Sequence, residues 1–372
     1  MTDLTAPPGQ IINDGSGRIF PCDECGADLV FNIGEQKLKC PYCSAVKEID
    51  ISEDAEITEQ DFEATLKQIQ EQKVDASQQE NDHNEVRCES CGSNVVFDGT
   101  LTSTECPYCG SPLQRENVHR GGFRIPVEAV LPFKIDQRLA ENKVAEWVKS
   151  RWFAPNEFKK RGAQGKINGC YLPFWTFDTL TFTIYKGERG EDKTETVGSG
   201  DDERQVTTTD WYPASGRFQR FFDDVLINGT KNLSETHVNS LSPWPLQDCY
   251  PFTQEVLAGH FARTYDLELS DAFPIAKKLM DAKLLTDTKK RIGGDKQRVH
   301  SIKSRYDEIT FKHVLLPVYM LAYRYHDKSY QVFVNAATGT VHGDRPYSWI
   351  KITLTIFSVI SAVLLVAMLA QS

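Results

Sequence analysis

Two similar cysteine modules constrain this chain more than any other feature. Each module holds two C-x-x-C pairs with fourteen residues between them, and the second pair reads Cys-Pro-Tyr-Cys in both. The residues after the first pair also match, Gly-Ala-Asp-Leu-Val-Phe in one module and Gly-Ser-Asn-Val-Val-Phe in the other. Eight of the ten cysteines belong to the modules: Cys22, Cys25, Cys40, Cys43, Cys88, Cys91, Cys106 and Cys109.

This spacing suits a tetrahedral Zn²⁺ ion, which takes four thiolates at about 2.3 Å. Each C-x-x-C turn supplies two sulfurs, and a hairpin brings the second pair to the other side of the metal. Four cysteines leave no open coordination position, so the predicted ions are structural rather than catalytic. The modules therefore predict two β zinc ribbons with one Zn²⁺ each. Two disulfides per module, or iron in a rubredoxin-like site, are the alternatives.

The C-terminal segment predicts a membrane anchor. Residues 352–370 carry no charge, and nineteen residues of helix cross a hydrocarbon core of about 30 Å. Arg345, Tyr347, Trp349 and Lys351 precede this segment, which is typical of the cytoplasmic interface of a spanning helix. We expect a transmembrane helix over 349–370, with the rest of the chain in the reducing cytoplasm, where zinc thiolates persist. A buried core helix is the alternative. The polar N-terminus predicts no signal peptide.

The charge distribution divides the N-terminal half of the chain. The net charge is −10, and residues 51–86 alone hold eleven acidic and two basic residues. Within this linker, Phe62, Leu66 and Ile69 follow the spacing of one short helix. The predicted order is a disordered N-terminus (1–17), zinc ribbon 1 (18–50), acidic linker (51–86), zinc ribbon 2 (87–115), α+β cytoplasmic domain (116–348) and transmembrane helix (349–370).

The predicted fold class is multidomain α+β. In the large domain, Asp136 is a suitable N-cap for a helix that ends near Trp152, with Leu139 among its apolar residues. Alternating apolar residues predict several strands with glycine-rich turns between them. The expected elements are helices near 254–266 and 272–285, and strands near 181–185, 205–212, 217–227, 309–325 and 330–335.

The chain shows little sign of catalysis, and we expect no enzymatic activity. Gly187–Thr194 is close to a phosphate-binding loop, but Asp192 stands where the motif requires glycine. This segment is therefore expected to be a charged hairpin loop.

Other candidate catalytic groups lack partners in the sequence. His313 and His326 match no metalloprotease pattern, and Cys170 and Cys249 have no recognisable base nearby. Asp223–Asp224 is expected not to form a shared metal site, because adjacent strand residues point to opposite faces.

Charge counts argue against nucleic acid as the ligand of the ribbons. Residues 18–50 hold four basic and six acidic residues, and residues 87–115 hold two and three. Phosphate binding depends on clustered Lys and Arg, so the ribbons are better protein-interaction modules. One stretch, 277–305, has ten basic and three acidic residues. It is either a solvated surface or a contact for anionic lipid headgroups, the acidic linker or nucleic acid.

The chain resembles bacterial membrane proteins with TFIIB-type zinc ribbons, many of which are labelled "primosomal protein N′ (replication factor Y), superfamily II helicase". The resemblance covers most of the chain. Besides the cysteine modules, it rests on Gly169–Asp178, Phe222–Ile227, Phe311–Tyr319 and Tyr330–Ile352. A helicase would need motor motifs, and the expected Walker A sequence is missing here.

The resemblance implies a role beside particular partners. Relatives are often encoded next to PspA/ESCRT-III-like and SPFH-type proteins, which implies work in membrane-stress or membrane-remodelling assemblies. We therefore expect a tail-anchored adaptor or scaffold, with a single pass through the bacterial inner membrane. The alternative function is an accessory protein of replication or transcription that binds nucleic acid.

Overall fold

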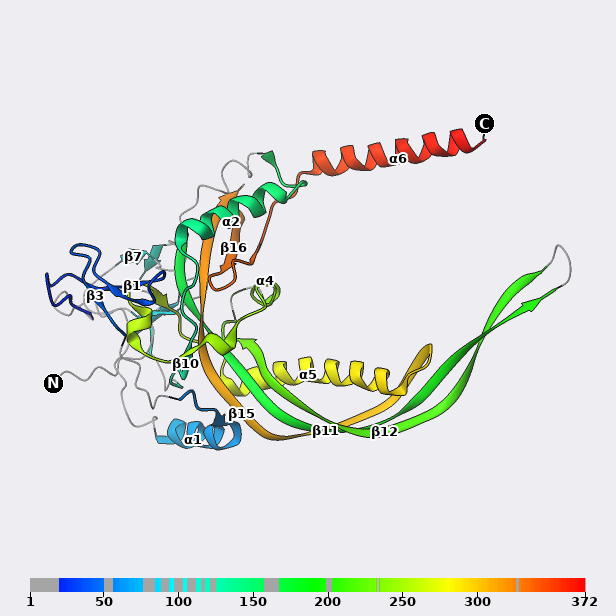
Figure 1. Ribbon diagram of the computed structural model, residues 1–372, viewed down its shortest axis with the longest axis horizontal. Helices are drawn as coiled ribbons and strands as arrows, with labels where there is room; N and C mark the ends of the chain where they lie inside the picture. The colour runs from blue at the N-terminus through cyan, green and yellow to red at the C-terminus, as the bar shows by residue number, and fades with distance from the viewer. Residues whose placement is uncertain are drawn as a thin grey trace.

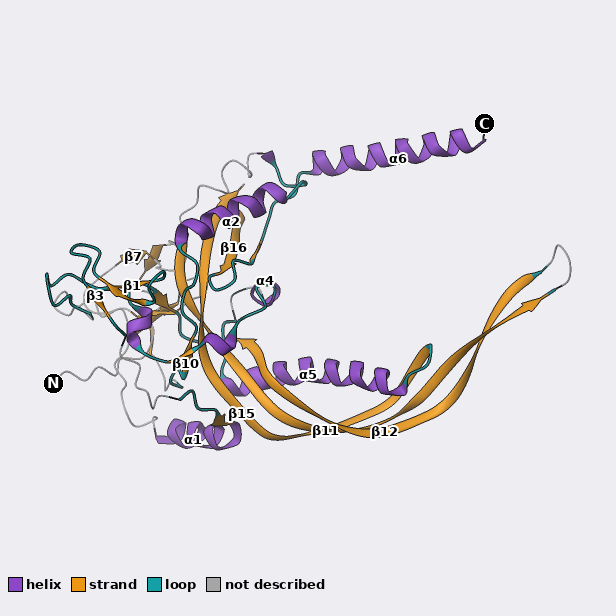
Figure 2. Cartoon of the chain, viewed as in Figure 1, coloured by secondary structure: helices purple, strands orange, loops and turns teal. Residues whose placement is uncertain are grey.

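The structure is a computed structural model of the chain. It describes residues 20–49, 56–75, 84–87, 94–96, 103–105, 112–114, 118–120, 125–156, 167–198, 203–231, 233, 235–325 and 328–371. The segment 1–17, predicted to be disordered, lies outside these ranges. The architecture is mixed α+β, as predicted, and a large curled sheet dominates it (Figure 1, Figure 2).

Three long antiparallel strands form the centre of that sheet. They are β11 (Asn168–Val197), β12 (Arg204–Asn228) and β15 (Lys296–Tyr325), with β11 between the other two. Beyond the body of the protein they continue together as a curved arm (Figure 1). The sequence predicted several shorter strands separated by turns, and this prediction is wrong for both β11 and β12.

The glycines that suggested turns lie inside the long strands. A Cβ on Gly187 would lie 2.2 Å from the carbonyl oxygen of Arg298, and one on Gly216 would lie 2.7 Å from the Tyr185 hydroxyl. In a strand interior, glycine often marks the close approach of another group rather than a turn. These residues allow dense packing across the arm.

The burial pattern of β11 explains how one strand serves two environments. Residues 170–179 are buried without interruption, whereas residues 180–187 largely alternate between buried and more exposed. Uninterrupted burial is typical of a strand covered on both faces, and alternation is typical of a strand covered on one. The first half of β11 therefore lies in the body of the protein, and the second half forms the arm.

Short strands complete the nine-stranded sheet. The order is β12-β11-β15-β10-β13, while β14 pairs with β11, β4 and β16 pair with β15, and β17 pairs with β16. These strands are β4 (Gln60–Asp61), β10 (Ala129–Val130), β13 (Tyr250–Pro251), β14 (Phe261–Ala262), β16 (Lys328–Asn335) and β17 (Val341–Gly343).

Helix α5 (Leu269–Ile292) covers the inner face of the arm (Figure 1). Its buried residues recur at helical spacing and form one stripe along the helix. They are Leu269, Ala272, Ala276, Met280, Leu284, Thr288 and Ile292. The helix expected over 272–285 is confirmed and is longer than predicted.

The helix expected over 254–266 is wrong. The structure has a 3₁₀ turn, η5 (Gln254–Leu257), followed by strand β14. Between them Gly259 has φ 81°, and a Cβ at this position would lie 3.2 Å from the Val30 side chain. The contact with a distant segment decides the local conformation here.

Helix α2 (Gln137–Ser150) forms where the sequence predicts it. The Asp136 side chain accepts a hydrogen bond from the Leu139 N–H at 2.7 Å and caps the helix. Ala140, Val144, Trp147 and Val148 are buried, while Leu139 is exposed rather than buried as expected. Two further short helices among the described residues are α4 (Glu235–Asn239) and η4 (Leu246–Asp248).

The first cysteine module is a small sheet docked on the body. It consists of β1 (Val30–Asn32), β2 (Lys37–Lys39) and β3 (Val46–Lys47). Phe31 joins the main hydrophobic core, and its N–H donates to the Ala258 carbonyl at 3.0 Å. The Gln36 side chain donates to the Phe133 carbonyl at 3.1 Å. These contacts hold the module in one place.

The predicted linker helix is confirmed and also docks. It is α1 (Phe62–Asp75), preceded by β4, which pairs with β15. The Phe62 ring lies 4.7 Å from the Phe273 ring and 6.0 Å from the Phe177 ring, centroid to centroid. This part of the acidic linker therefore belongs to the body.

The second cysteine module is described only through its strands. β5 pairs with β6 and β9, and β7 pairs with β8. The strands are β5 (Asn84–Arg87), β6 (Asn94–Val96), β7 (Ser103–Glu105), β8 (Pro112–Gln114) and β9 (Val118–Arg120). The four cysteines expected to bind a second metal, Cys88, Cys91, Cys106 and Cys109, lie outside the described residues.

The C-terminal helix α6 (Trp349–Gln371) contacts the body through its first turn and then projects away from it (Figure 1). Among the described residues it is the one helix long and apolar enough to cross a membrane, over Trp349–Leu369. None of its apolar window is buried in the protein. A buried core helix, the alternative reading, is therefore wrong.

Candidate metal centre

The first knuckle of the docked module is a tight turn around Cys22. The Cys22 N–H donates to the Ala27 carbonyl at 2.7 Å, and the Gly26 N–H donates to the Cys22 carbonyl at 2.8 Å. Gly26 has φ 69°, a conformation that glycine adopts without a Cβ clash. This turn brings Cys25 back toward the side of Cys22.

The second knuckle repeats this geometry with different residues. The Cys40 N–H donates to the Ala45 carbonyl at 2.8 Å, and the Ser44 N–H donates to the Cys40 carbonyl at 3.0 Å. Ser44 takes the place of glycine with φ 65°, although a side chain there costs of order 1 kcal/mol. The equivalent hydrogen bonds show that the two knuckles are the same motif.

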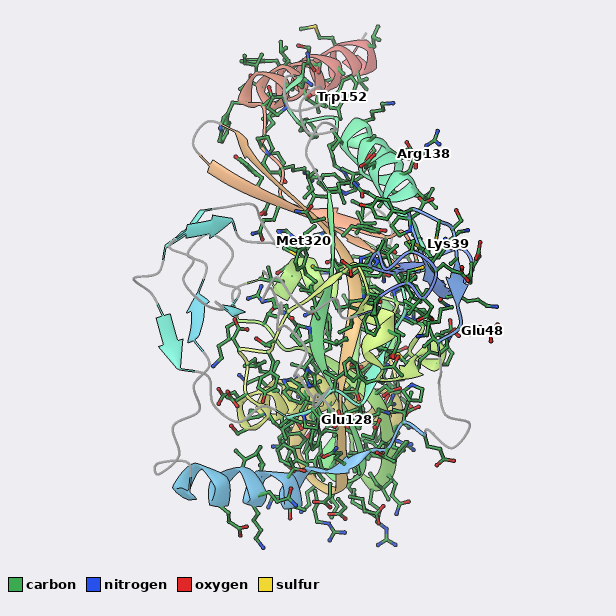
Figure 3. The ribbon with its side chains drawn as sticks, turned by 90° about the vertical axis from the view of Figure 1, so that its left-hand side faces the viewer. Lys39, Glu48, Glu128, Arg138, Trp152 and Met320 are labelled. Carbon is green, nitrogen blue, oxygen red and sulfur yellow. The ribbon has the colours of Figure 1, made fainter. Side chains whose placement is uncertain are left out.

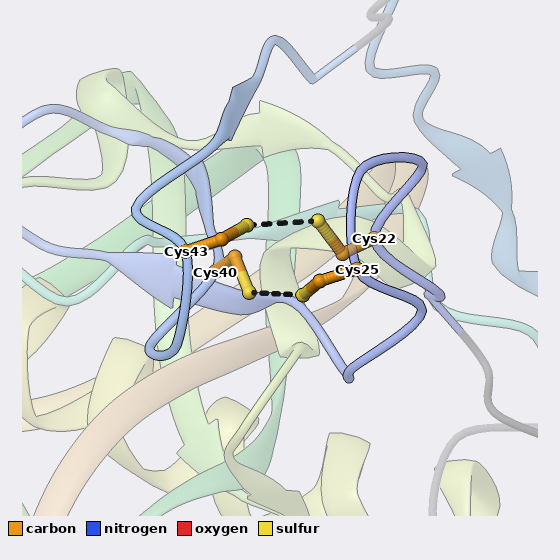
Figure 4. Close-up of side chains that lie close together, drawn as sticks. All are labelled: Cys22, Cys25, Cys40 and Cys43. Carbon is orange, nitrogen blue, oxygen red and sulfur yellow. Dashed lines mark hydrogen bonds between the residues drawn. The ribbon is translucent and has the colours of Figure 1, made fainter.

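The four sulfurs form a compact group (Figure 4). The Sγ atoms of Cys22 and Cys43 are 3.5 Å apart, as are those of Cys25 and Cys40, and all four lie within 4.8 Å of one another. A tetrahedron with metal–sulfur distances of about 2.3 Å has edges of about 3.8 Å. The cluster therefore has the size required to bind a metal ion. All four cysteines are free, and disulfide sulfurs would be about 2.05 Å apart.

Backbone hydrogen bonds, burial and the neighbouring thiols shift the pKa values of Cys40 and Cys43 in opposite directions. The pKa of Cys40 is lowered to about 6, mainly by the backbone N–H of Cys43. Burial opposes this shift, and the N–H of Tyr42 adds to it. At Cys43 the backbone N–H of Ala45 lowers the pKa, but the other thiols and burial outweigh it and raise the pKa to about 12. A divalent cation would keep all four as thiolates, because its charge offsets their mutual repulsion.

Cys22 and Cys40 are buried, while Cys25 and Cys43 face solvent. Leu29 and Leu38 pack beside the buried pair, together with Ala258 of the body. An ion held by all four sulfurs would have a complete tetrahedron and no position for substrate. Such a centre can stabilise the module but offers no open site for catalysis.

The structure corrects the interpretation of Asp223 and Asp224. A bulge between β11 and β12 and a φ of 49° at Asp224 break the alternation of this strand. Their carboxylates consequently lie with that of Asp178 in one group, within 4.8 Å of one another. The expectation that the two side chains are separated by the sheet is wrong.

A lysine already supplies positive charge to this group. The Lys312 ammonium is 2.9 Å from Asp224 and 3.5 Å from Asp178, and Glu59 binds it from the linker at 3.2 Å. Burial raises the pKa of Asp178 to about 6, against the opposing effects of the Asp224 N–H and Lys312. The cluster is an internal ion-pair network that ties the linker segment to the sheet. Sequence reasoning missed it because its members are far apart in the chain.

A second unpredicted cluster joins α4 to β17. His237 Nδ1 lies 2.9 Å from His342 Nδ1, and His237 Nε2 lies 2.7 Å from an oxygen of Asp344. Burial, followed by the neighbouring His237, lowers the pKa of His342. The nitrogens bond to each other and to the carboxylate, so this cluster acts as a structural clasp.

The remaining candidates from the sequence take structural places. His313 is a buried histidine, and Cys170 is buried with its Sγ 3.4 Å from the Met320 sulfur. Burial raises the pKa of Cys170 and of Cys249 to about 12, which disfavours a nucleophilic thiolate. His326 lies outside the described residues.

The segment Gly187–Thr194 is not the loop that the sequence predicts. It lies within β11 and pairs with β12 throughout, and its first four residues also pair with β15. A phosphate-binding loop requires a turn that leads into a helix, so this segment cannot be one.

The basic stretch 277–305 is divided between α5 and the start of β15. Several of its cations are neutralised locally, such as Lys296 by Asp192 at 2.8 Å and Arg298 by Glu188 at 3.5 Å. The guanidinium of Arg298 also stacks on Trp211, 3.7 Å from the ring centroid. The net charge of this stretch therefore overstates the positive surface that it presents.

Comparisons with known proteins give a similar sequence but no described activity. No protein-family profile and no solved structure matches the chain. The chain is similar to the uncharacterized protein YdjG of Bacillus subtilis (strain 168), with 22% identity over 322 residues. The match covers 70% of this chain and 90% of the relative.

Proposed function

We propose that this protein is a non-enzymatic, membrane-anchored adaptor whose zinc ribbons bind a protein partner. The observation that carries this proposal is the position of Tyr42. The first ribbon is fixed to the body through Phe31 and Gln36, while Tyr42, inside the second knuckle, is 82% exposed. The ribbon thus holds an aromatic side chain in solvent on a rigid, docked support.

The anchor in this proposal is α6, inserted once into the bacterial inner membrane with the body in the cytoplasm. Its exposed apolar surface supports this role, since water does not solvate such a helix well. Arg345 and Lys351 at its N-terminal end favour a cytoplasmic location for that end. Free cysteines fit a reducing compartment.

The ion assigned to each cysteine module is zinc. Four sulfur ligands at tetrahedral spacing suit Zn²⁺, which has no redox chemistry and no geometric preference of its own. For the second module the assignment rests on the repeated motif: Cys88, Cys91, Cys106 and Cys109. In both modules the ion would fix the knuckle and thereby the tyrosine of the Cys-Pro-Tyr-Cys sequence.

The resemblance to TFIIB-type zinc-ribbon membrane proteins supplies the class of partner. We assign a PspA/ESCRT-III-like or SPFH-type protein of a membrane-stress or membrane-remodelling assembly. Aromatic side chains are enriched in the cores of protein interfaces, which supports Tyr42 as the contact residue.

Tyr42→Ala tests the adaptor function without disturbing the metal ligands. Loss of a central aromatic contact weakens binding by about 2 kcal/mol or more, which is roughly thirtyfold. We expect this loss when the detergent-solubilised full chain is titrated with purified PspA-like and SPFH-type partners. Tyr212→Ala, which removes an exposed aromatic ring from the arm, is the matched control and should bind normally. Equal partner affinity of wild type and Tyr42→Ala, at equal zinc content, would contradict the proposal.

A nucleic-acid accessory is the second candidate, favoured by lysines that form no ion pair with the other described residues. They are Lys278, Lys283, Lys289, Lys290 and Lys303. Phosphate contacts made by these lysines would give DNA binding that falls steeply with salt. Strong binding of this kind by the full chain, unchanged by Tyr42→Ala, would favour this function over the adaptor.

A further inference from the structure

The start of α6 is tied to the loop that follows α2. The Ser348 N–H donates to the Phe153 carbonyl at 2.8 Å. The Lys351 ammonium donates to the Ala154 carbonyl at 2.8 Å and to the Asn156 side chain at 2.7 Å. The first turn of the helix and this loop therefore form one surface, although they are far apart in the sequence.

Four aromatic side chains on this surface are exposed. Trp152 and Phe153 come from the loop, with 70% and 38% exposure, and Tyr347 and Trp349 come from the start of α6, with 56% and 77%. Figure 3 shows Trp152 beside the beginning of α6, at the end of α2 remote from Arg138. Exposed aromatic rings next to an apolar helix are typical of the membrane–water interface.

Two arginines accompany these rings. Arg151 stacks on Trp147, 4.9 Å from the ring centroid, and Arg345 stacks on Tyr347 at 5.3 Å. Neither guanidinium forms an ion pair with a carboxylate in the described part of the chain. Partial burial, and after it the positive charge of Arg345, lower the pKa of Arg151. Lipid phosphates at this surface would accept hydrogen bonds from both guanidiniums and supply the negative charge that they lack.

We propose that this surface is a docking site for anionic phospholipid headgroups. It consists of Arg151, Trp152, Phe153, Arg345, Tyr347 and Trp349. The inference rests on the proposed insertion of α6, whose apolar surface continues directly from it. The arginines would bind lipid phosphates while the aromatic rings lie at headgroup depth. The C-terminal end of α2 is thereby held on the bilayer. This site is distinct from the basic stretch 277–305, which belongs to α5 and β15.

The depth of Trp152 tests this site in the full chain. The protein is reconstituted into vesicles of phosphatidylcholine alone or with phosphatidylglycerol, each with lipids brominated near the headgroup. The difference in tryptophan fluorescence between wild type and Trp152→Phe isolates the signal of Trp152. We expect this signal to be quenched, and more strongly when phosphatidylglycerol is present. Inorganic phosphate added to the buffer should not reverse the quenching, because the rings require the bilayer as well as the anion.

Arginine variants test the charge component. Each basic residue near an anionic surface shifts binding about fivefold. The double variant Arg151→Gln, Arg345→Gln should therefore lower the ratio of membrane-bound to unbound loop by more than tenfold in phosphatidylglycerol vesicles. The quenching of Trp152 measures this ratio. Arg138→Gln, at the opposite end of α2, should leave the quenching unchanged.

Two negative outcomes separate the site from the anchor. If α6 resists extraction by alkaline carbonate but Trp152 is not quenched, the docking site is refuted and the anchor stands. If carbonate releases the wild-type protein, the proposed anchor fails and the docking site fails with it. Quenching that survives the double arginine substitution would refute the phosphate contacts.

Discussion

Replacing Cys40 with serine removes one ligand of the candidate metal centre. Cys40 is 1% exposed, and its Sγ lies 3.5 Å from that of Cys25. A serine hydroxyl stays protonated near pH 7, whereas the centre needs four thiolates. We expect Cys40→Ser to lose one metal ion per chain while the second module keeps its own.

The size of the effect follows from the small core of the module. Four of its residues and Ala258 form its buried apolar cluster. Ordering some thirty residues costs about 1 kcal/mol or more of conformational free energy for each residue, and so small a cluster cannot offset this cost. Structural zinc contributes about 10–16 kcal/mol in small zinc-dependent domains. Docking through Phe31 contributes about 3–5 kcal/mol, as judged by truncation of buried phenylalanines. Docking alone is too weak, so residues 20–49 should unfold while the large sheet remains folded.

Two measurements check this outcome. Elemental analysis of anaerobically purified protein gives the number of metal ions per chain, and hydrogen exchange locates the unfolded region. The Phe31 amide, which donates to Ala258 in the native protein, should lose its protection, while the amides of β11 keep theirs. Cys249→Ser makes the same chemical change outside the modules and should retain all metal. Full metal content or native protection of residues 20–49 in Cys40→Ser would refute the reasoning.

Three further perturbations probe the rest of the fold. Phe31→Ala should weaken the docking of the first cysteine module by about 3–5 kcal/mol, measured as faster hydrogen exchange in residues 20–49. Val46→Ala, at an exposed site, should change the docking free energy by less than about 0.5 kcal/mol. Burial raises the pKa of Glu128 to about 7. Between about pH 4 and pH 7 the native state therefore keeps a proton on Glu128 that the unfolded state has lost, so the free energy of unfolding falls as pH rises through this window. Glu128→Gln should remove this pH dependence, which amounts to about 3 kcal/mol. Urea titrations at several pH values measure it, and the same fall of unfolding free energy with pH in the variant would contradict this explanation. Lys312→Met leaves the buried Asp178 carboxylate without its cation and should cost about 3–5 kcal/mol of unfolding free energy. Lys296→Met, in an exposed pair, should cost about 1 kcal/mol or less. Equal costs in chemical denaturation would show that burial does not matter.

The arm shows why strand boundaries could not be predicted. Gly187 and Gly216 carry the same local signal in a turn as in a strand interior that packs against a neighbouring group. Only the positions of Arg298 and Tyr185 in the folded sheet distinguish the two cases. The failed helix near Gly259 has the same cause, since Val30 occupies the space beside it.

The sequence alone determined the first cysteine cluster, the capped helix α2, the linker helix α1 and the apolar C-terminal helix. Their physics is local, because ligand spacing, the helical period and an uncharged run are properties of neighbouring residues. Tertiary structure decided the docking of the first cysteine module and the gathering of Asp178, Asp224 and Lys312. It also joined the start of α6 to the loop after α2. Each of these features joins residues separated by tens or hundreds of positions, whose distances depend on sheet register, bulges and packing that no local pattern encodes.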